Sequence, residues 1–135
     1  MVLALFGGTY REGADLAELN RITTGLLPSL QAIPGFISYN FYTADEGEDL
    51  AVVRFASRAA IEAWRNDLTH RAIWERMKEF YSEFWVQSAD AYRELLWTEG
   101  DRQVFEGGES DAPRMTELYR SRSDRYGLGS AEYGQ

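Results

Sequence analysis

Apolar residues occupy both alternating sets of positions in several short segments, which is typical of strands with two buried faces. Residues 2–9, 36–43 and 50–56 have this pattern. The last two segments flank an acidic loop, so they predict a β-hairpin. Residues 85–97 predict the last strand, in one piece or two. These segments together predict a β-sheet.

Apolar residues repeat every three or four positions between the predicted strands. One stripe covers residues 16–30, preceded by Asp15, which has Glu18 at the spacing of a capping box. Pro28 is expected to kink this helix or end it early. Ser57 is a candidate cap for a second helix. A third helical stripe consists of His70, Ile73, Met77, Phe80 and Phe84.

The predicted order is therefore β-α-β-β-α-β, an α+β ferredoxin-like arrangement with an antiparallel sheet. The helices of such a fold cover one face of the sheet, so strands that are apolar on both faces need a second cover. Each large apolar side chain left in water forgoes about 1.5–3 kcal/mol. We therefore expect a homodimer in which two copies pack sheet against sheet.

The composition changes after Thr98, and this change divides the chain into two parts. Residues 1–98 contain the elements of the predicted sheet and are expected to form the main domain. Residues 99–135 are expected to be a C-terminal extension, with a loop over 99–109 and a short amphipathic helix over 115–123.

The composition excludes several classes of function. Fourteen Lys and Arg oppose 22 Asp and Glu, and the net charge of −8 disfavours nucleic acids and anionic membrane surfaces as partners. No apolar run approaches the ~20 residues of a membrane span, and the N-terminal residues lack the pattern of a signal peptide, so we expect a cytoplasmic protein. The chain has no Cys, which excludes a Cys nucleophile. His70 is its one histidine, which excludes a His-rich metal site.

Several motifs follow one another in a recognisable order. The chain has Pro34-Gly35-Phe36 before the hairpin, residues 52–57 within it, and a Trp-x5-His helix formed by Trp64 and His70. Further matching motifs are Phe80-Tyr81, Val86-Gln87 and Arg93-Glu94. Over residues 2–97 the chain resembles the antibiotic biosynthesis monooxygenase (ABM) family. The resemblance implies a dimeric α+β barrel with one pocket per subunit, between the sheet and the helices.

The activities known in that family give the functional expectation. Some members oxidise polycyclic phenols without a cofactor, some oxidise quinols, and others degrade haem. The first-strand Asn of the haem-degrading members is missing, because the matching stretch is Leu5-Phe6-Gly7. The Asn and Trp of the phenol-oxidising members match Ala51 and Phe55. The chain thus resembles the family in its scaffold and lacks both of these constellations.

His70 is the candidate catalytic base, because the unperturbed pKa of histidine lies near neutrality. The alternative is a structural histidine bonded to a backbone carbonyl near a helix start. Asn40 and Arg54 are candidate catalytic donors that would stabilise an anion. The alternatives are a dimer-interface network, outward-facing positions or, for Arg54, an ion pair with an acidic residue. The predicted substrate-binding residues are large or aromatic, with ordinary core packing as the alternative. They are Tyr39, Tyr42, Phe55, Trp64, Trp74 and Tyr81.

The resemblance, together with His70 on the apolar stripe, implies a monooxygenase of secondary metabolism that uses dioxygen on an aromatic, polyketide-like and enolisable substrate, with no cofactor or metal. His70, or a water that it holds, would remove a proton, Asn40, Tyr39 or Arg54 would stabilise the anion, and the carbanion would react with dioxygen. Three alternatives stay open. They are a haem-binding or haem-degrading protein, a cyclase or isomerase, and a non-catalytic binding module whose C-terminal extension clasps a partner.

Overall fold

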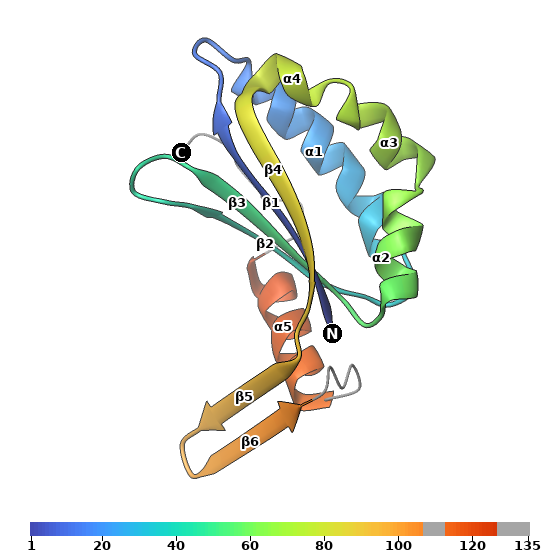
Figure 1. Ribbon diagram of the computed structural model, residues 1–135, viewed down its shortest axis with the longest axis vertical. Coiled ribbons are helices and arrows are strands. Elements are labelled where there is room, and N and C mark those ends of the chain that lie inside the picture. Colours follow the sequence, from blue (N-terminus) through green and yellow to red (C-terminus); the bar gives the residue numbers. More distant parts are fainter. Residues whose placement is uncertain (107–112, 127–135) are drawn as a thin grey trace.

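A four-stranded antiparallel sheet with helices on one face forms the body of the protein (Figure 1). The computed structural model describes residues 1–106 and 113–126. The strands of this sheet are β1 (Val2–Tyr10), β2 (Phe36–Thr43), β3 (Asp49–Phe55) and β4 (Tyr81–Asp90). Their spatial order is β2-β3-β1-β4, and every neighbouring pair is antiparallel. The predicted ferredoxin-like α+β fold is therefore confirmed.

Four helices lie on one side of this sheet (Figure 1). They are α1 (Leu16–Gln31), α2 (Arg58–Arg65), α3 (Leu68–Trp74) and α4 (Met77–Phe80). The side chains of Asp15, Ser57 and Asp67 accept hydrogen bonds from the backbone at the starts of the first three. The prediction that Pro28 could end α1 early was wrong, because the helix continues to Gln31. Pro28 is exposed, and the burial of Leu30 stabilises the last turn.

The third helical stripe ends sooner than its apolar pattern predicts. α4 ends at Phe80 and β4 begins at Tyr81, so Phe84 lies in a strand and not on a helix. This part of the chain pairs with β1, where Gly8 leaves room for aromatic rings. A Cβ atom on Gly8 would lie 2.6 Å from the ring of Tyr81. Packing against the sheet therefore overrides the helical spacing here.

Strand alternation gives the sheet two different faces. The face toward α1–α4, here called the helix face, carries Val2, Ala4, Phe6, Tyr39, Phe41, Ala51, Val53 and Phe55. The opposite face, here called the open face, carries Leu3, Leu5, Ser38, Asn40, Tyr42, Val52, Arg54 and Trp85. A bulge at Ile37 shifts the register of β2 between Phe36 and Ser38.

The chain leaves the main sheet after Asp90. β5 (Arg93–Thr98) pairs with β6 (Asp101–Glu106) in a separate hairpin that turns at Gly100, whose φ is 84°. The predicted last strand is thus two pieces, β4 and β5. The predicted loop over 99–109 was wrong for β6, and residues 107–109 lie outside the described part of the chain.

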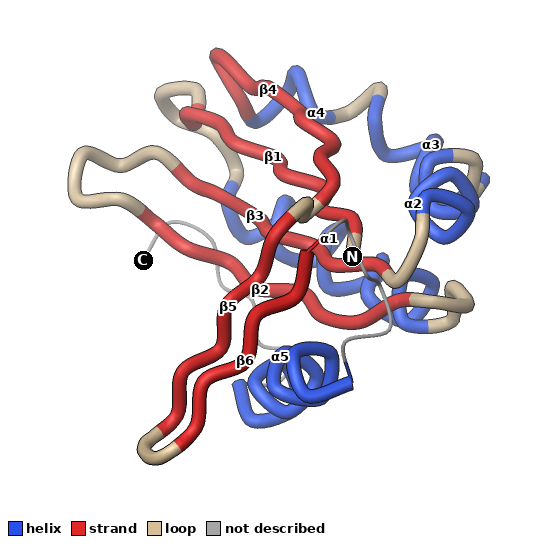
Figure 2. Tube along the Cα trace, turned by 60° about the horizontal axis from the view of Figure 1, so that its bottom comes forward, coloured by secondary structure: helices blue, strands red, loops and turns tan. Residues whose placement is uncertain are grey.

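α5 (Pro113–Tyr126) includes the helix predicted at 115–123 and extends beyond it at both ends. It lies on the open face next to β2 (Figure 2). Met115 of α5 is buried with Met1 and Ile37. The C-terminal extension of the same chain therefore covers part of the face for which we expected a second copy as the cover.

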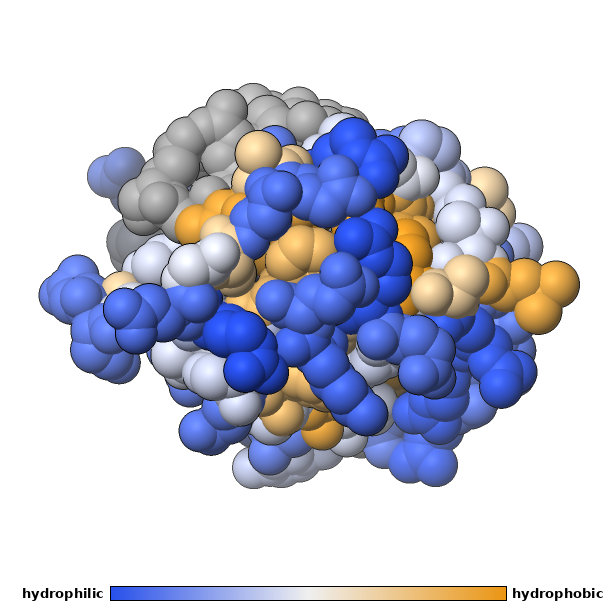
Figure 3. Space-filling view, turned by 90° about the horizontal axis from the view of Figure 1, so that it is seen from above, coloured by the Kyte–Doolittle hydropathy of each residue, from blue (hydrophilic) through white to orange (hydrophobic). Residues whose placement is uncertain are grey.

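Hydrophilic side chains cover most of the end of the molecule that carries α4, and apolar side chains show between them (Figure 3). Within residues 1–106 and 113–126, none of the helices has both the length and the apolar run needed to cross a membrane.

Candidate functional site

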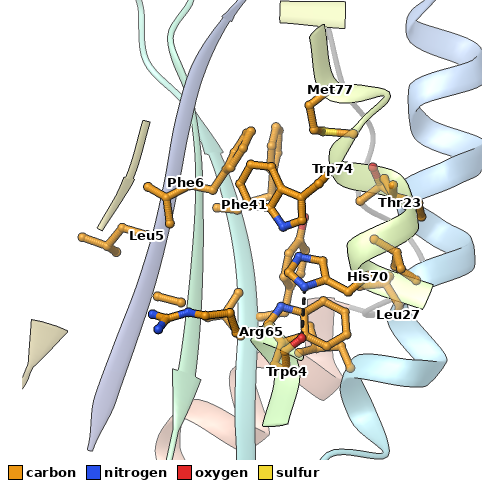
Figure 4. A pocket seen from close by; sticks show the side chains of 18 of the residues that line it. Leu5, Phe6, Thr23, Leu27, Phe41, Trp64, Arg65, His70, Trp74 and Met77 are labelled. Atoms are coloured by element: carbon orange, nitrogen blue, oxygen red, sulfur yellow. Dashed lines mark hydrogen bonds between the residues drawn. The ribbon is translucent and has the colours of Figure 1, made fainter. Parts of the chain in front are cut away.

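A cavity of about 190 Å³ lies between the helix face of the sheet and helices α1–α3 (Figure 4). Most of its wall is apolar, because inward strand residues meet the apolar stripes of the helices there. The polar side chains that line it are Thr23, Tyr39, Arg65, His70, Tyr81 and Ser88. Since a dry cavity of about 150 Å³ can hold a benzene molecule, this one has room for about one or two aromatic rings.

The junction between α2 and α3 holds the imidazole of His70 in one orientation. Asp67 caps α3 by accepting a hydrogen bond from the backbone N–H of His70 at 2.9 Å. The ring of His70 stacks on the indole of Trp64 with 4.0 Å between centroids and 14° between planes. Nδ1 of His70 lies 3.1 Å from the carbonyl oxygen of Trp64, the bond drawn as a dashed line in Figure 4.

This hydrogen bond decides which nitrogen of His70 can act as a base. A carbonyl oxygen only accepts hydrogen bonds, so Nδ1 carries the proton and Nε2 keeps its lone pair in the neutral ring. The ring lies at the cavity wall, with its second nitrogen on the side of Trp74 (Figure 4). Burial lowers the pKa of the His70 imidazole, and this effect exceeds the opposing effects of the Trp64 carbonyl and the Asp67 carboxylate. Burial therefore favours the neutral form of the imidazole.

Aromatic rings continue from His70 along the cavity. The Trp74 ring lies 5.9 Å from the His70 ring and 6.1 Å from the Phe6 ring. Phe6 in turn meets Tyr81 edge to face at 5.3 Å. These spacings are typical of favourable aromatic contacts, and the wall offers ring faces and edges to a planar ligand.

The cavity reaches β4, one of the two edge strands of the sheet. Val86 lines the cavity and is 49% exposed. On the helix side, the guanidinium of Arg65 donates a hydrogen bond from Nη2 to the Ser88 hydroxyl at 3.3 Å. We call the opening bounded by Arg65, Val86 and Ser88 the mouth.

The structure brings four of the predicted substrate-binding residues to the cavity, with His70 beside them. These four are Tyr39, Trp64, Trp74 and Tyr81. Nδ1 of His70 makes the carbonyl bond of the structural alternative, and the ring also lines the cavity, so the role of His70 as a base stays a prediction.

Three other predicted site residues lie on the open face, away from His70. Asn40, Tyr42 and Arg54 alternate with the cavity-lining residues of β2 and β3. Nη1 of Arg54 donates to Oδ1 of Asn40 at 3.3 Å, and the guanidinium lies 3.9 Å from the ring centroid of Tyr119 in α5. The expectation that Asn40 and Arg54 act in one pocket with His70 is corrected, because the sheet separates them.

Phe55 faces the helices but does not reach the cavity. Its side chain is 0% exposed and belongs to the core with Val2, Leu30 and Ile61. Sequence reasoning also missed Thr23, Arg65 and Ser88 as lining residues. Thr23 lies in the apolar stripe of α1, which was a usable signal. Arg65 and Ser88 carry no such signal, since only the approach of α2 to β4 brings them together.

Comparison with known proteins agrees with this architecture. The profile of the family described as antibiotic biosynthesis monooxygenase matches residues 9–76, half of the chain. The molecule is thus an α+β protein of ferredoxin-like topology with a cavity under its helices. The chain belongs to the antibiotic biosynthesis monooxygenase family. None of the curated proteins compared with it matches.

Solved structures with the same fold are distant in sequence. Rv0793 from Mycobacterium tuberculosis is 20% identical, with a TM-score of 0.58 over 65% of this chain and 91% of that one. SO0527 from Shewanella oneidensis is 17% identical, with a TM-score of 0.59 over 77% of this chain and 91% of that one. A Deinococcus radiodurans protein assigned to the antibiotic biosynthesis monooxygenases is 12% identical, with a TM-score of 0.61 over 73% of this chain and 99% of that one.

Haem, which other members of the family process, fits this cavity poorly. Nε2 of His70 is suited to an iron ion, since a neutral imidazole is a common metal ligand. Haem has four pyrrole rings, however, whereas about 190 Å³ holds about one or two rings. The single permanent cation on the wall within the described residues is Arg65, and haem has two propionates. The side chains present therefore favour a smaller ligand than haem.

Proposed function

We propose that the protein is a monooxygenase that oxidises an enolisable aromatic compound with dioxygen and without a cofactor. One observation carries this proposal. The imidazole of His70, with Nδ1 3.1 Å from the Trp64 carbonyl oxygen, lines a cavity of aromatic and aliphatic side chains. The volume of about 190 Å³ favours a substrate with about one or two rings over the larger polycyclic phenols.

Nε2 of His70 removes a proton from a phenol or from an acidic methylene next to a carbonyl. The apolar walls keep water from the enolate, and Tyr39 is the one of the three predicted donors that lines the cavity. The carbanion then forms a bond to dioxygen. One oxygen atom remains on the substrate as a carbonyl and the other leaves as water, so CH2 and O2 give C=O and H2O. The methylene supplies the four electrons, and His70 returns its proton to the departing oxygen.

Oxygen uptake with a size-graded panel tests this proposal. The panel contains one-ring and two-ring phenols and enolisable ketones, with anthrone as a three-ring compound, and chelator is present throughout. We expect uptake above the spontaneous rate for the smaller compounds, and one atom of ¹⁸O from ¹⁸O2 in each product molecule. Uptake equal to that without protein across the panel would contradict the proposal.

We also propose that two copies associate through the part of the open face that α5 leaves free. Leu3, Leu5 and Trp85 lie on this face, half-exposed. Light scattering is expected to give twice the mass of 15.4 kDa, and Leu5→Asp is expected to give a single chain. A 15.4 kDa particle for the unchanged protein would contradict this pairing.

A further inference from the structure

The mouth of the cavity carries a cationic side chain on a protein that is strongly negative overall. The chain has a net charge of −8. Among the described residues that line the cavity, however, the one with a permanent charge is Arg65, and its ion-pair partner Glu62 lies outside the cavity lining. A ligand that enters by the mouth thus passes a cation, and its remaining length then meets apolar and aromatic side chains.

Arg65 is anchored so that its guanidinium stays at the mouth. Nη1 lies 2.9 Å from Oε1 of Glu62, one turn earlier on α2, and Nη2 donates to Ser88 across the opening. Figure 4 shows the Arg65 side chain extending from α2 past the cavity toward the strands. The bond to Ser88 is a weak one between exposed groups, so a stronger acceptor can replace it. The Ser88 hydroxyl can then donate to the same acceptor.

We propose that the mouth selects substrates that carry a carboxylate on the aromatic system, with Arg65 and Ser88 as the specificity-determining residues. The carboxylate lies between the guanidinium and the Ser88 hydroxyl, and the ring lies in the cavity beside His70. Charge-assisted hydrogen bonds to a guanidinium are stronger than those between neutral groups. This inference rests on the proposed function for the reaction, but the recognition it describes is a binding property and is measured without turnover.

A matched pair of ligands tests the proposal. The probes are 3-hydroxy-2-naphthoate and its carboxamide, which have the same rings and differ in charge, and Kd is measured by calorimetry without dioxygen. The protein is expected to bind the acid more tightly than the carboxamide by about fivefold, as for a partly exposed ion pair, and less so at high salt. Arg65→Gln is expected to remove this preference and leave the Kd of the carboxamide unchanged.

Two control variants sharpen the test. Arg58→Gln removes another cation of α2, one that pairs with Asp90 and does not line the cavity, and it should keep the preference. Glu62→Gln removes the carboxylate that competes for Arg65, and it should strengthen binding of the acid. Equal affinities for acid and carboxamide, no binding of either, or the same loss in Arg58→Gln and Arg65→Gln would overturn the proposal. Tighter binding of the acid without any oxygen uptake would instead contradict the proposed oxidation and still support the carboxylate site at the mouth.

Discussion

The two faces of the sheet are built from the same strands and hold different chemistry. On the helix face, Tyr39 and Val53 form part of an apolar cavity wall. On the open face, their neighbours Asn40 and Arg54 bond to each other, and Arg54 packs against Tyr119 of α5. A step of one residue along β2 or β3 therefore separates a candidate reaction chamber from a contact that attaches the C-terminal helix.

The difference shows that polarity alone does not locate a site. Arg54 and Asn40 are strong hydrogen-bonding groups, and the fold uses them for attachment. The helix face has few such groups around His70, and its burial lowers the pKa of the imidazole. An apolar surrounding thus keeps the base unprotonated at neutral pH, which a more polar chamber with nearby carboxylates would not do.

The largest expected effect is on turnover, and it differs between the two faces. His70→Gln is expected to lower kcat/KM for the oxidised substrate by about 10²–10⁴-fold, the usual contribution of a general base. Asn40→Ala, on the open face, is expected to leave kcat/KM close to that of the unchanged protein. Initial rates of oxygen uptake measure both. Similar losses in the two variants would contradict the assignment of the chemistry to the helix face.

The pH profile of the same reaction sharpens this contrast. Because burial lowers the pKa of His70, kcat/KM should be level above about pH 6.5 and fall at more acidic pH, as the base becomes protonated. The free energy of unfolding changes with pH in the same direction. The unfolded chain binds this proton more readily, so stability decreases as the pH falls below about 6.5 toward the lowered pKa. In His70→Gln this part of the decrease should be absent from urea midpoints.

The next largest effect is on stability, where the two faces should again differ. Phe55, at 0% exposed, lies in the core of the helix face, and Phe55→Ala is expected to cost about 3–5 kcal/mol. Met115 is 5% exposed between α5 and the open face, and Met115→Ala is expected to cost about 2 kcal/mol, the low end for a buried methionine. Urea unfolding measures both values. A loss of stability in Met115→Ala that is larger than the loss in Phe55→Ala would show that α5 is a principal part of the core.

The element order was predictable from the sequence because its signals are local. The capping side chains Asp15 and Ser57 and the acidic hairpin loop act over a few residues, and the structure has the elements where these signals predict them. β6 was missed because its residues alternate weakly between polar and apolar. The end of the third stripe was missed because Phe84 packs on β1, a contact distant in sequence.

The assignment of residues to faces was less predictable. Both alternating sets of β2 hold large apolar side chains, so its pattern does not say which set faces the helices. In an unbroken strand, alternation from Phe36 would place Asn40 on the helix face with Phe36. The bulge at Ile37 reverses this alternation and places Asn40 on the open face. Arg54 and Phe55 are adjacent, so alternation alone could have separated them. Arg65 resembles any solvated helix residue until β4 is placed beside α2.

A smaller effect is expected where α5 meets the open face. The guanidinium of Arg54 lies over the ring of Tyr119, a cation–π contact worth about 0.5–1 kcal/mol at a partly exposed site. A double-mutant cycle with Arg54→Gln and Tyr119→Leu, followed by urea unfolding, should give a coupling energy in this range. Oxygen uptake should stay unchanged in both single variants. Additive losses would mean that the two side chains are neighbours without an energetic contact.

The smallest effect concerns the helix layer that covers the cavity. Glu18 of α1 binds Arg21 and also Arg76, at the start of α4, and these hydrogen bonds lower the pKa of its carboxyl to about 2. A carboxyl with a lowered pKa stabilises the fold above its usual pKa of about 4.3, and this stabilisation is lost as the pH falls toward about 2. Glu18→Gln should therefore lower the urea midpoint slightly at pH 7, and the difference should shrink between pH 4.3 and pH 2. Glu12→Gln, in the exposed turn before α1, is the matched control. A difference that stays constant with pH would mean that the Glu18 side chain contributes packing and not charge.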